Sequence, residues 1–129
     1  MPTIMNFLNE ALAQLAPGKE YVNRGDYIEW YDNPNPPTWD MINAKMAQLQ
    51  ADEPMRQLRE ERDRRLTACD YIVVKSAETG RPVPQAWLDY RQALRDLPST
   101  SSPQCWPTFQ LKLDSIGWPT PPGDVNTSI

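Results

Sequence analysis

Histidine is absent from this chain of 129 residues, and its two cysteines are Cys69 and Cys105. Imidazole is the side chain most often used as a general base and metal ligand near neutral pH. Its absence excludes histidine-dependent catalysis and most zinc sites. Two thiols alone make a poor metal site, and in a chain with this pattern we expect them to be free rather than paired. The sequence therefore predicts no cofactor and no metal.

Long apolar runs and excess positive charge are also missing. No stretch approaches the roughly 20 apolar residues that cross a bilayer, and no basic region precedes an apolar run at the N-terminus. The formal net charge of -4 disfavours nonspecific binding to nucleic acid or to anionic membranes. We therefore expect a cytoplasmic protein whose partners include neither nucleic acid nor membrane.

The first part of the chain predicts a small helix and a β-hairpin. Apolar residues recur at helical spacing over residues 3–16, and Pro17 ends that pattern. Glu20–Asn23 and Tyr27–Tyr31 then alternate in polarity around a glycine-containing turn, as two short paired strands do. Residues 38–50 follow with a threonine cap and a second helical stripe.

Two further amphipathic segments predict a helical hairpin. The first begins with an acidic cap and Pro54, and the second lies between Pro84 and Pro98. Residues 71–84 contain a glycine and two prolines, so we predict an irregular loop that lets the helices fold back antiparallel. The predicted core of the hairpin consists of Leu58, Leu66, Cys69, Tyr71, Trp87, Tyr90, Leu94 and Leu97.

Arginines in the first helix of this hairpin alternate with acidic residues. Pairs four residues apart, such as Glu60 with Arg64 and Glu61 with Arg65, are each worth only a few tenths of a kcal/mol. Binding phosphates needs positive charge that acids do not cancel. The pattern therefore favours a solvated helix over a nucleic-acid surface.

The C-terminal part predicts one short strand between two tryptophans. Phe109, Leu111 and Leu113 alternate with polar residues, and Trp106 and Trp118 flank them. Such a strand either packs on its own domain or adds to a sheet edge or groove of another chain. The second alternative is favoured, because an exposed strand edge is otherwise a liability.

These segments together predict an α+β fold. The small helix and β-hairpin unit takes up residues 1–51, and the helical hairpin takes up residues 52–98. The 14 prolines cluster around residues 34–37 and over residues 98–122, which favours turns and extended backbone there. We therefore expect residues 99–129 to form an extended arm rich in proline and tryptophan.

The hairpin contains a motif made of Arg59, Arg62–Leu66, Cys69–Tyr71, Trp87 and Tyr90–Pro98. With this motif the chain resembles the tail assembly chaperone domain of tailed bacteriophages and the C-terminal part of phage tail fibre assembly proteins. The resemblance covers roughly residues 56–122 and includes a Trp-Pro pair near the end of the chain. Tyr71 departs from it, since the family more often has tryptophan there, and Ile72–Val74 replaces a more polar run.

The resemblance implies a chaperone rather than an enzyme, with a phage tail fibre or related receptor-binding protein as partner. Trimeric β-rich fibres assemble slowly and expose strand edges until three chains are in register. A homo-oligomer is implied too, and a trimer would match the fibre's symmetry. The partner-binding residues that we expect are Tyr27, Trp30, Tyr31, Trp106, Phe109, Leu111, Leu113 and Trp118.

Two alternatives remain open. A rigid hairpin with aromatic arms could also serve as a structural tail or baseplate component retained in the virion. An enzyme could use two of the carboxylates of Asp63, Asp70, Asp89 and Asp96 as a catalytic pair. Helical acids beside arginines are more often salt-bridged surface groups, which disfavours catalysis.

Overall fold

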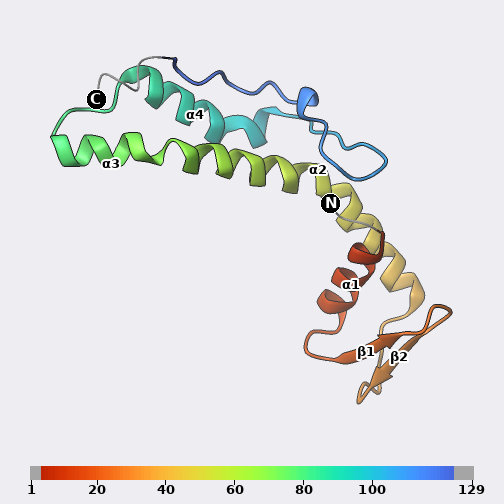
Figure 1. Cartoon of the computed structure of the whole chain (residues 1–129). Coiled ribbons are helices and arrows are strands. Elements are labelled where there is room, and N and C mark those ends of the chain that lie inside the picture. The colour runs from red at the N-terminus through yellow and green to blue at the C-terminus, as the bar shows by residue number, and fades with distance from the viewer. Residues whose placement is uncertain (1–3, 124–129) are drawn as a thin grey trace. The chain divides into compact units, whose positions relative to one another are not determined.

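The chain forms two compact units (Figure 1). The computed structural model describes the backbone of residues 4–123 and the side chains of residues 7–123. The N-terminal unit holds residues 4–53 together with residues 107–110, and the helical unit holds the other described residues from Pro54 onward. Helices predominate beside one two-stranded antiparallel sheet, so the predicted α+β class is confirmed.

The N-terminal unit begins with helix α1 (Ile4–Leu15) and continues with strands β1 (Glu20–Asn23) and β2 (Ile28–Tyr31). The strands pair antiparallel in one register, with Glu20 opposite Tyr31. The predicted N-terminal helix and β-hairpin are both confirmed. The buried apolar residues of this unit are Phe7, Ala11, Leu12, Ala16 and Ile42.

Glycines with positive φ make the two reversals of this unit. Gly18, with a φ of 75°, ends the turn after α1, and Gly25, with a φ of 89°, lies in the hairpin turn. The Arg24 N–H donates to the Tyr27 carbonyl oxygen at 2.9 Å, and the Gly25 N–H donates to Asn23 Oδ1 at 2.9 Å. Side chains are strained at such φ values, which explains glycine at both positions.

Helix α2 (Trp39–Ala68) is one continuous helix of 30 residues. The Thr38 hydroxyl caps it by accepting the Met41 N–H at 3.2 Å, as the sequence predicts. The predicted break before Pro54 is wrong, because the helix continues through that proline. Proline removes a single helical N–H, and the flanking residues are good helix formers that continue the hydrogen bonding on either side.

The helical unit also contains helices α3 (Asp70–Thr79) and α4 (Gln85–Thr100). In Figure 1, α4 runs back alongside α3 and the end of α2. Apolar residues at spacings of three and four give α4 one buried face. The buried core of the unit consists of Leu58, Cys69, Ile72, Trp87, Tyr90, Leu94, Leu97, Leu111 and Ile116, and Leu66 packs against it half-buried.

Helix α3 replaces much of the loop predicted over residues 71–84, so that prediction is wrong. No glycine or proline lies within Asp70–Thr79, so nothing there interrupts a helix. Gly80 follows with a φ of 71° and ends the helix. Tyr71 was predicted in the core but is exposed, while its neighbour Ile72 is fully buried. Successive helical residues point about 100° apart, so the core takes only one of the two side chains.

Helix α4 also extends past its predicted end at Pro98, to Thr100. Proline is tolerated here because just one helical hydrogen bond is lost, near the end of the helix. The Ser99 hydroxyl donates to the Asp96 carbonyl oxygen at 2.8 Å, which satisfies one of the last carbonyl groups. Extended backbone at Ser101 then ends the helix.

No strand forms over residues 109–113, so that prediction is wrong too. Phe109 adopts a φ of 64°, which breaks an extended run. A single antiparallel bridge joins Cys105 to Leu111, and a 3-10 turn, η1 (Leu113–Ser115), follows.

The predicted extended arm instead packs on helices in its described part. Leu111 and Ile116 are buried in the core of the helical unit, and Trp118 packs against that core. An arm with apolar residues lowers its free energy by burying them on its own helices when no partner covers them.

Replacing Leu94 tests this core. Leu94 in α4 is fully buried, so Leu94→Ala is expected to lower the free energy of unfolding by about 2–5 kcal/mol through lost burial and a cavity. Urea denaturation followed by circular dichroism measures the change. Leu88→Ala is the matched control on the same helix, because Leu88 is 43% exposed and its loss should cost under about 0.5 kcal/mol. An equal loss of unfolding free energy in the two variants would contradict the burial of Leu94 in this core.

Candidate functional site

One face of the β-hairpin is directed toward α1. Tyr21 and Trp30 lie opposite each other across the two strands, with ring centroids 5.3 Å apart. The Tyr21 hydroxyl donates to Asn9 Oδ1 of α1 at 3.1 Å. Trp30 is therefore half-buried on this face, and its ring is less available to a partner than the sequence suggests.

The other face of the hairpin carries charge and exposed rings. Arg24 pairs with Glu29 at 2.6 Å, and this hydrogen bond, together with the attraction of the carboxylate, raises the pKa of Arg24. Tyr31 lies on the same face as Glu29, since the two are two residues apart in one strand. Tyr31 is 44% exposed and Tyr27 in the turn is 56% exposed. Two phenol rings are thus open to another molecule on this hairpin.

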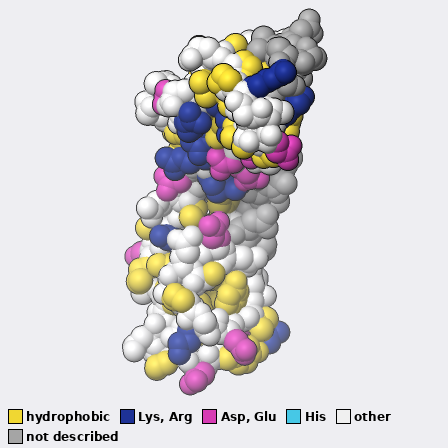
Figure 2. Space-filling view, turned by 90° about the vertical axis from the view of Figure 1, so that its left-hand side faces the viewer, with side chains coloured by type: hydrophobic (Ala, Val, Ile, Leu, Met, Phe, Trp, Pro, Cys, Tyr) yellow, Lys and Arg dark blue, Asp and Glu magenta, His cyan; other side chains and the backbone are white. Residues whose placement is uncertain are grey.

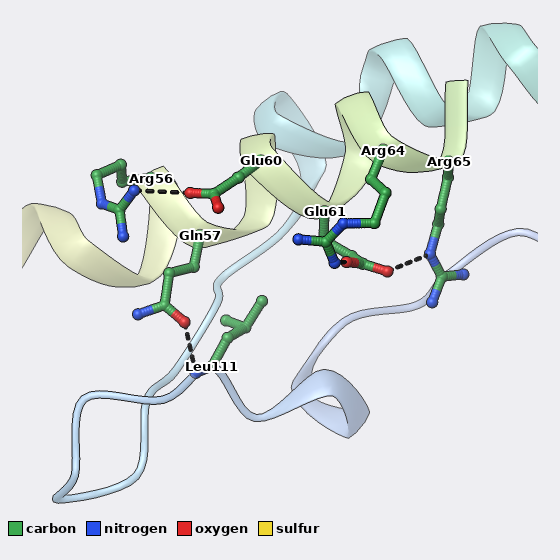
Figure 3. Close-up of polar contacts among 7 residues, drawn as sticks. All are labelled: Arg56, Gln57, Glu60, Glu61, Arg64, Arg65 and Leu111. Carbon is green, nitrogen blue, oxygen red and sulfur yellow. Dashed lines mark hydrogen bonds and ion pairs between the residues drawn. The ribbon is translucent and has the colours of Figure 1, made fainter. Parts of the chain in front are cut away.

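Leu111 is buried within its own chain. It was predicted to bind the tail protein, but its side chain is buried in the core of the helical unit. Its backbone N–H donates to Gln57 Oε1 of α2 at 2.8 Å, as Figure 3 shows. The alternation of apolar and polar residues correctly predicts that Leu111 is covered. It does not predict whether its own chain or a partner covers it.

Trp118 and Phe109 are both half-buried against their own chain. The Arg65 guanidinium lies 4.1 Å from the Trp118 ring centroid, and the Trp118 indole N–H donates to the Leu113 carbonyl oxygen at 3.1 Å. Phe109 packs edge-on against Phe7 of α1 at 4.9 Å between ring centroids. These contacts leave part of each ring exposed.

Trp106 and Leu113 remain half exposed in the C-terminal segment. The Lys112 ammonium lies 4.4 Å from the Trp106 ring centroid and covers part of it. Of the eight predicted partner-binding residues, the structure therefore leaves four largely exposed: Tyr27, Tyr31, Trp106 and Leu113.

Other exposed apolar residues were not predicted as contact sites. Tyr71, Val73 and Val74 lie on the outer side of α3. The sequence did contain a signal, because the four consecutive apolar residues 71–74 cannot all face one core if they are helical. Further exposed apolar residues in the described part of the chain are Trp39, Met41 and Leu88.

Arg91 joins α4 to the junction of α2 and α3. Its guanidinium donates to the Leu66 carbonyl oxygen at 3.1 Å and to Cys69 Sγ at 3.0 Å, and it pairs with Asp70 at 3.1 Å. Burial lowers the pKa of Arg91, but the hydrogen bonds to Cys69 and Asp70 outweigh it and leave the pKa raised. Arg91 thus serves the packing of the helices, and Cys69 and Cys105 are not joined in a disulfide.

The charges of α2 neutralise one another. Glu61 pairs with Arg65 at 3.2 Å, as predicted, and also with Arg64, whereas Glu60 pairs with Arg56 at 2.7 Å rather than with Arg64 (Figure 3). On the face drawn in Figure 2, basic and acidic side chains are intermixed. That face offers no basic patch of the kind that binds phosphates.

The acids considered for catalysis all have partners. Asp63 pairs with Arg62 at 2.9 Å and Asp70 pairs with Arg91. Asp89 and Asp96 accept hydrogen bonds from glutamine amides one turn earlier, at 2.8 and 2.9 Å. Within residues 4–123 no three potential metal ligands cluster together, and no helix has the length and apolar character to cross a membrane.

A family model described as phage tail assembly chaperone protein matches residues 55–123, more than half of the chain. The chain belongs to this family. The match takes in the helical core and the C-terminal segment of the chaperone, and it confirms the resemblance found in the sequence. No curated protein and no solved structure matches the chain at a significant level.

In this tail assembly chaperone, Arg91→Ala should loosen the junction of α2 and α3. Charge-assisted hydrogen bonds are worth about 1.5–3 kcal/mol when buried, and the exposure of Asp70 reduces its share. We expect the free energy of unfolding to fall by about 1–3 kcal/mol, measured by urea denaturation. Arg95→Ala is the control one turn later, where the side chain is exposed. A loss no larger than that of the control would contradict the assigned role.

Alkaline pH gives a separate test of the chaperone's core. Burial raises the pKa of Tyr90, with a further contribution from Cys69, so the folded state disfavours its phenolate. A folded-state pKa above the unfolded value gives stability that is complete below about pH 10 and is lost as pH rises through the folded pKa. Urea denaturation between about pH 8 and 11 should show a steeper loss of stability for the wild type than for Tyr90→Phe. Parallel curves would argue against this burial effect.

Proposed function

We propose that this chaperone binds a phage tail fibre, or a related receptor-binding tail protein, while its chains fold and trimerise. The family match over the helical unit carries the proposal, because it assigns the chain to tail assembly. A fibre chain exposes apolar faces and strand edges until its three copies are in register. Covering those surfaces in the host cell would prevent aggregation during assembly.

The exposed aromatic residues support this role. Tyr27 and Tyr31 on the hairpin and Trp106 in the C-terminal segment present rings to solvent, and such rings dominate protein interfaces. We propose these three, together with Leu113, as the direct contacts. Trp30 and Phe109 would act by supporting them, since each packs on its own chain, whereas Leu111 and Trp118 hold the C-terminal segment on the helices.

The proposed role is one of binding and release, without catalysis or a cofactor. Trimeric fibres would be matched most simply by three chaperone copies, and we include this stoichiometry in the proposal. A chaperone should be absent from finished virions, whereas a structural component of the tail would remain in them.

Co-expression with the tail fibre protein of the same phage tests the proposal. We expect the fibre to be soluble and trimeric with the chaperone, to aggregate without it, and to co-elute with it in size-exclusion chromatography. A fibre that folds alone and forms no complex would refute the proposed function. Recovery of the chain in purified virions would indicate a structural component instead.

Surface variants locate the contact. Tyr27→Ala combined with Tyr31→Ala should weaken fibre binding about tenfold or more, because both truncated rings are exposed contacts with no part in the described core. Leu88→Ala, an exposed apolar residue of α4 outside the proposed contact, is the matched control. Equal fibre yield with all three proteins would exclude the hairpin as the contact.

A further inference from the structure

Residues 111–118, here called the strap, cover the helices of the helical unit. Leu111 and Ile116 are 7% and 6% exposed and belong to the same buried cluster as Leu58 of α2 and Leu94 of α4. Trp118 packs against that cluster. The strap therefore covers an apolar seat on α2 and α4, here called the groove, with aliphatic side chains five residues apart and an aromatic ring two residues later.

The strap is held by hydrogen bonds within itself and to Gln104 before it. The Lys112 N–H donates to the Gln104 carbonyl oxygen at 2.8 Å, and the Gln104 N–H donates to the Ser115 hydroxyl at 3.2 Å. The Ser115 hydroxyl donates to the Lys112 carbonyl oxygen at 2.6 Å, and the Trp118 N–H donates to the Ile116 carbonyl oxygen at 3.0 Å. None of these bonds involves one of the α-helices. A segment of this kind can leave its seat without breaking the hydrogen bonds of the helices.

Side chains of α2 hold the strap in place. Gln57 extends toward it and accepts the Leu111 N–H, and Arg65 reaches the Trp118 ring with its guanidinium 4.1 Å from the ring centroid (Figure 3 shows both α2 side chains). A backbone N–H, an aromatic ring and aliphatic side chains are features that many extended polypeptides share. A segment of another chain with these features could therefore make the same contacts with α2 and α4.

The cluster contains one polar atom that the strap leaves unsatisfied. Trp87 is 5% exposed, and its Nε1 has no hydrogen-bond acceptor among the described residues. Buried donors almost always have an acceptor, since leaving one unpaired costs free energy. Trp87 shares its cluster with Leu111 and Ile116, so the core that the strap helps to cover contains a buried donor without an acceptor among the described residues.

We propose that the groove under the strap is a docking site for an extended apolar segment of the tail protein, and that the strap holds the groove until that segment replaces it. The partner's identity rests on the function proposed above, whereas the groove rests on the strap's own contacts. The incoming segment would carry two aliphatic residues and an aromatic ring at the strap's spacing. Exchange keeps the helical core covered throughout, because one apolar segment takes the place of another.

Competition with the strap makes a direct test possible. The probe is a fluorescently labelled peptide of residues 111–123, added to the full chain and followed by fluorescence anisotropy. Trp118→Ala weakens the strap but leaves the groove intact, so it should bind the peptide about tenfold or more tightly than the wild type does. Asp114→Ala alters an exposed strap residue and should bind like the wild type. A scrambled peptide should bind none of them.

Ile116→Ala provides a second weakened strap in case Trp118→Ala does not fold. Circular dichroism establishes that each variant is folded before binding is measured. If folded variants bind the peptide no more tightly than the wild type does, the exchangeable groove is refuted. Weaker fibre binding by Trp118→Ala would also refute it, because Trp118 would then be a direct contact rather than a competitor.

Hydrogen exchange on the wild-type complex separates this inference from the proposed function. Adding the tail fibre should deprotect the Leu111 amide while the amides of α4 stay protected. A fibre that stays soluble with an unchanged strap would refute the groove and leave the chaperone function standing. Peptide exchange without any fibre binding would refute the tail protein as occupant, and dimers formed by the weakened variants would then identify a second copy of the chain.

Discussion

The apolar face of α4 is the constraint on which the helical unit depends. Trp87, Tyr90, Leu94 and Leu97 lie along one side of a single helix, and a helix of this kind is not stable in water unless that side is covered. The end of α2 and the residue Ile72 of α3 supply part of the cover, and Leu111 and Ile116 supply more. A pair of helices alone would bury too little surface, so the C-terminal segment belongs to the fold.

The same constraint decides which apolar and aromatic residues stay exposed. Leu111 belongs to the core and Trp118 packs against it, while Trp106 and Leu113 stay exposed beside them. In the N-terminal unit the strand pairing separates residues likewise, since Trp30 lies on the face toward α1 and Tyr31 on the opposite face. The arginines of α2 are neutralised in part by the acids beside them. Recognition by this chaperone would therefore rest mainly on apolar and aromatic surface.

Features that depend on neighbouring residues in the sequence could be predicted. The N-terminal helix, the hairpin and the buried face of α4 follow from periodicity, glycine and turn residues, and the structure confirms them. The extent of α2 could not be predicted from Pro54, because a proline costs a long helix one hydrogen bond and does not always end it. Tyr71 was placed in the core wrongly, because the sequence offers two adjacent apolar residues and does not say which one α3 turns inward.

The sequence by itself determined the α+β class, the family, the net charge and the absence of histidine chemistry, since each depends on composition, on local spacing or on a motif. The tertiary structure alone decided the place of the C-terminal segment. The alternation of Phe109, Leu111 and Leu113 was equally compatible with a partner's surface and with the chain's own helices. Leu111 is buried on the helices because Gln57, 54 residues earlier, accepts its N–H and the α4 face lies beside it. Contacts between residues so far apart in the chain are not encoded in any local pattern.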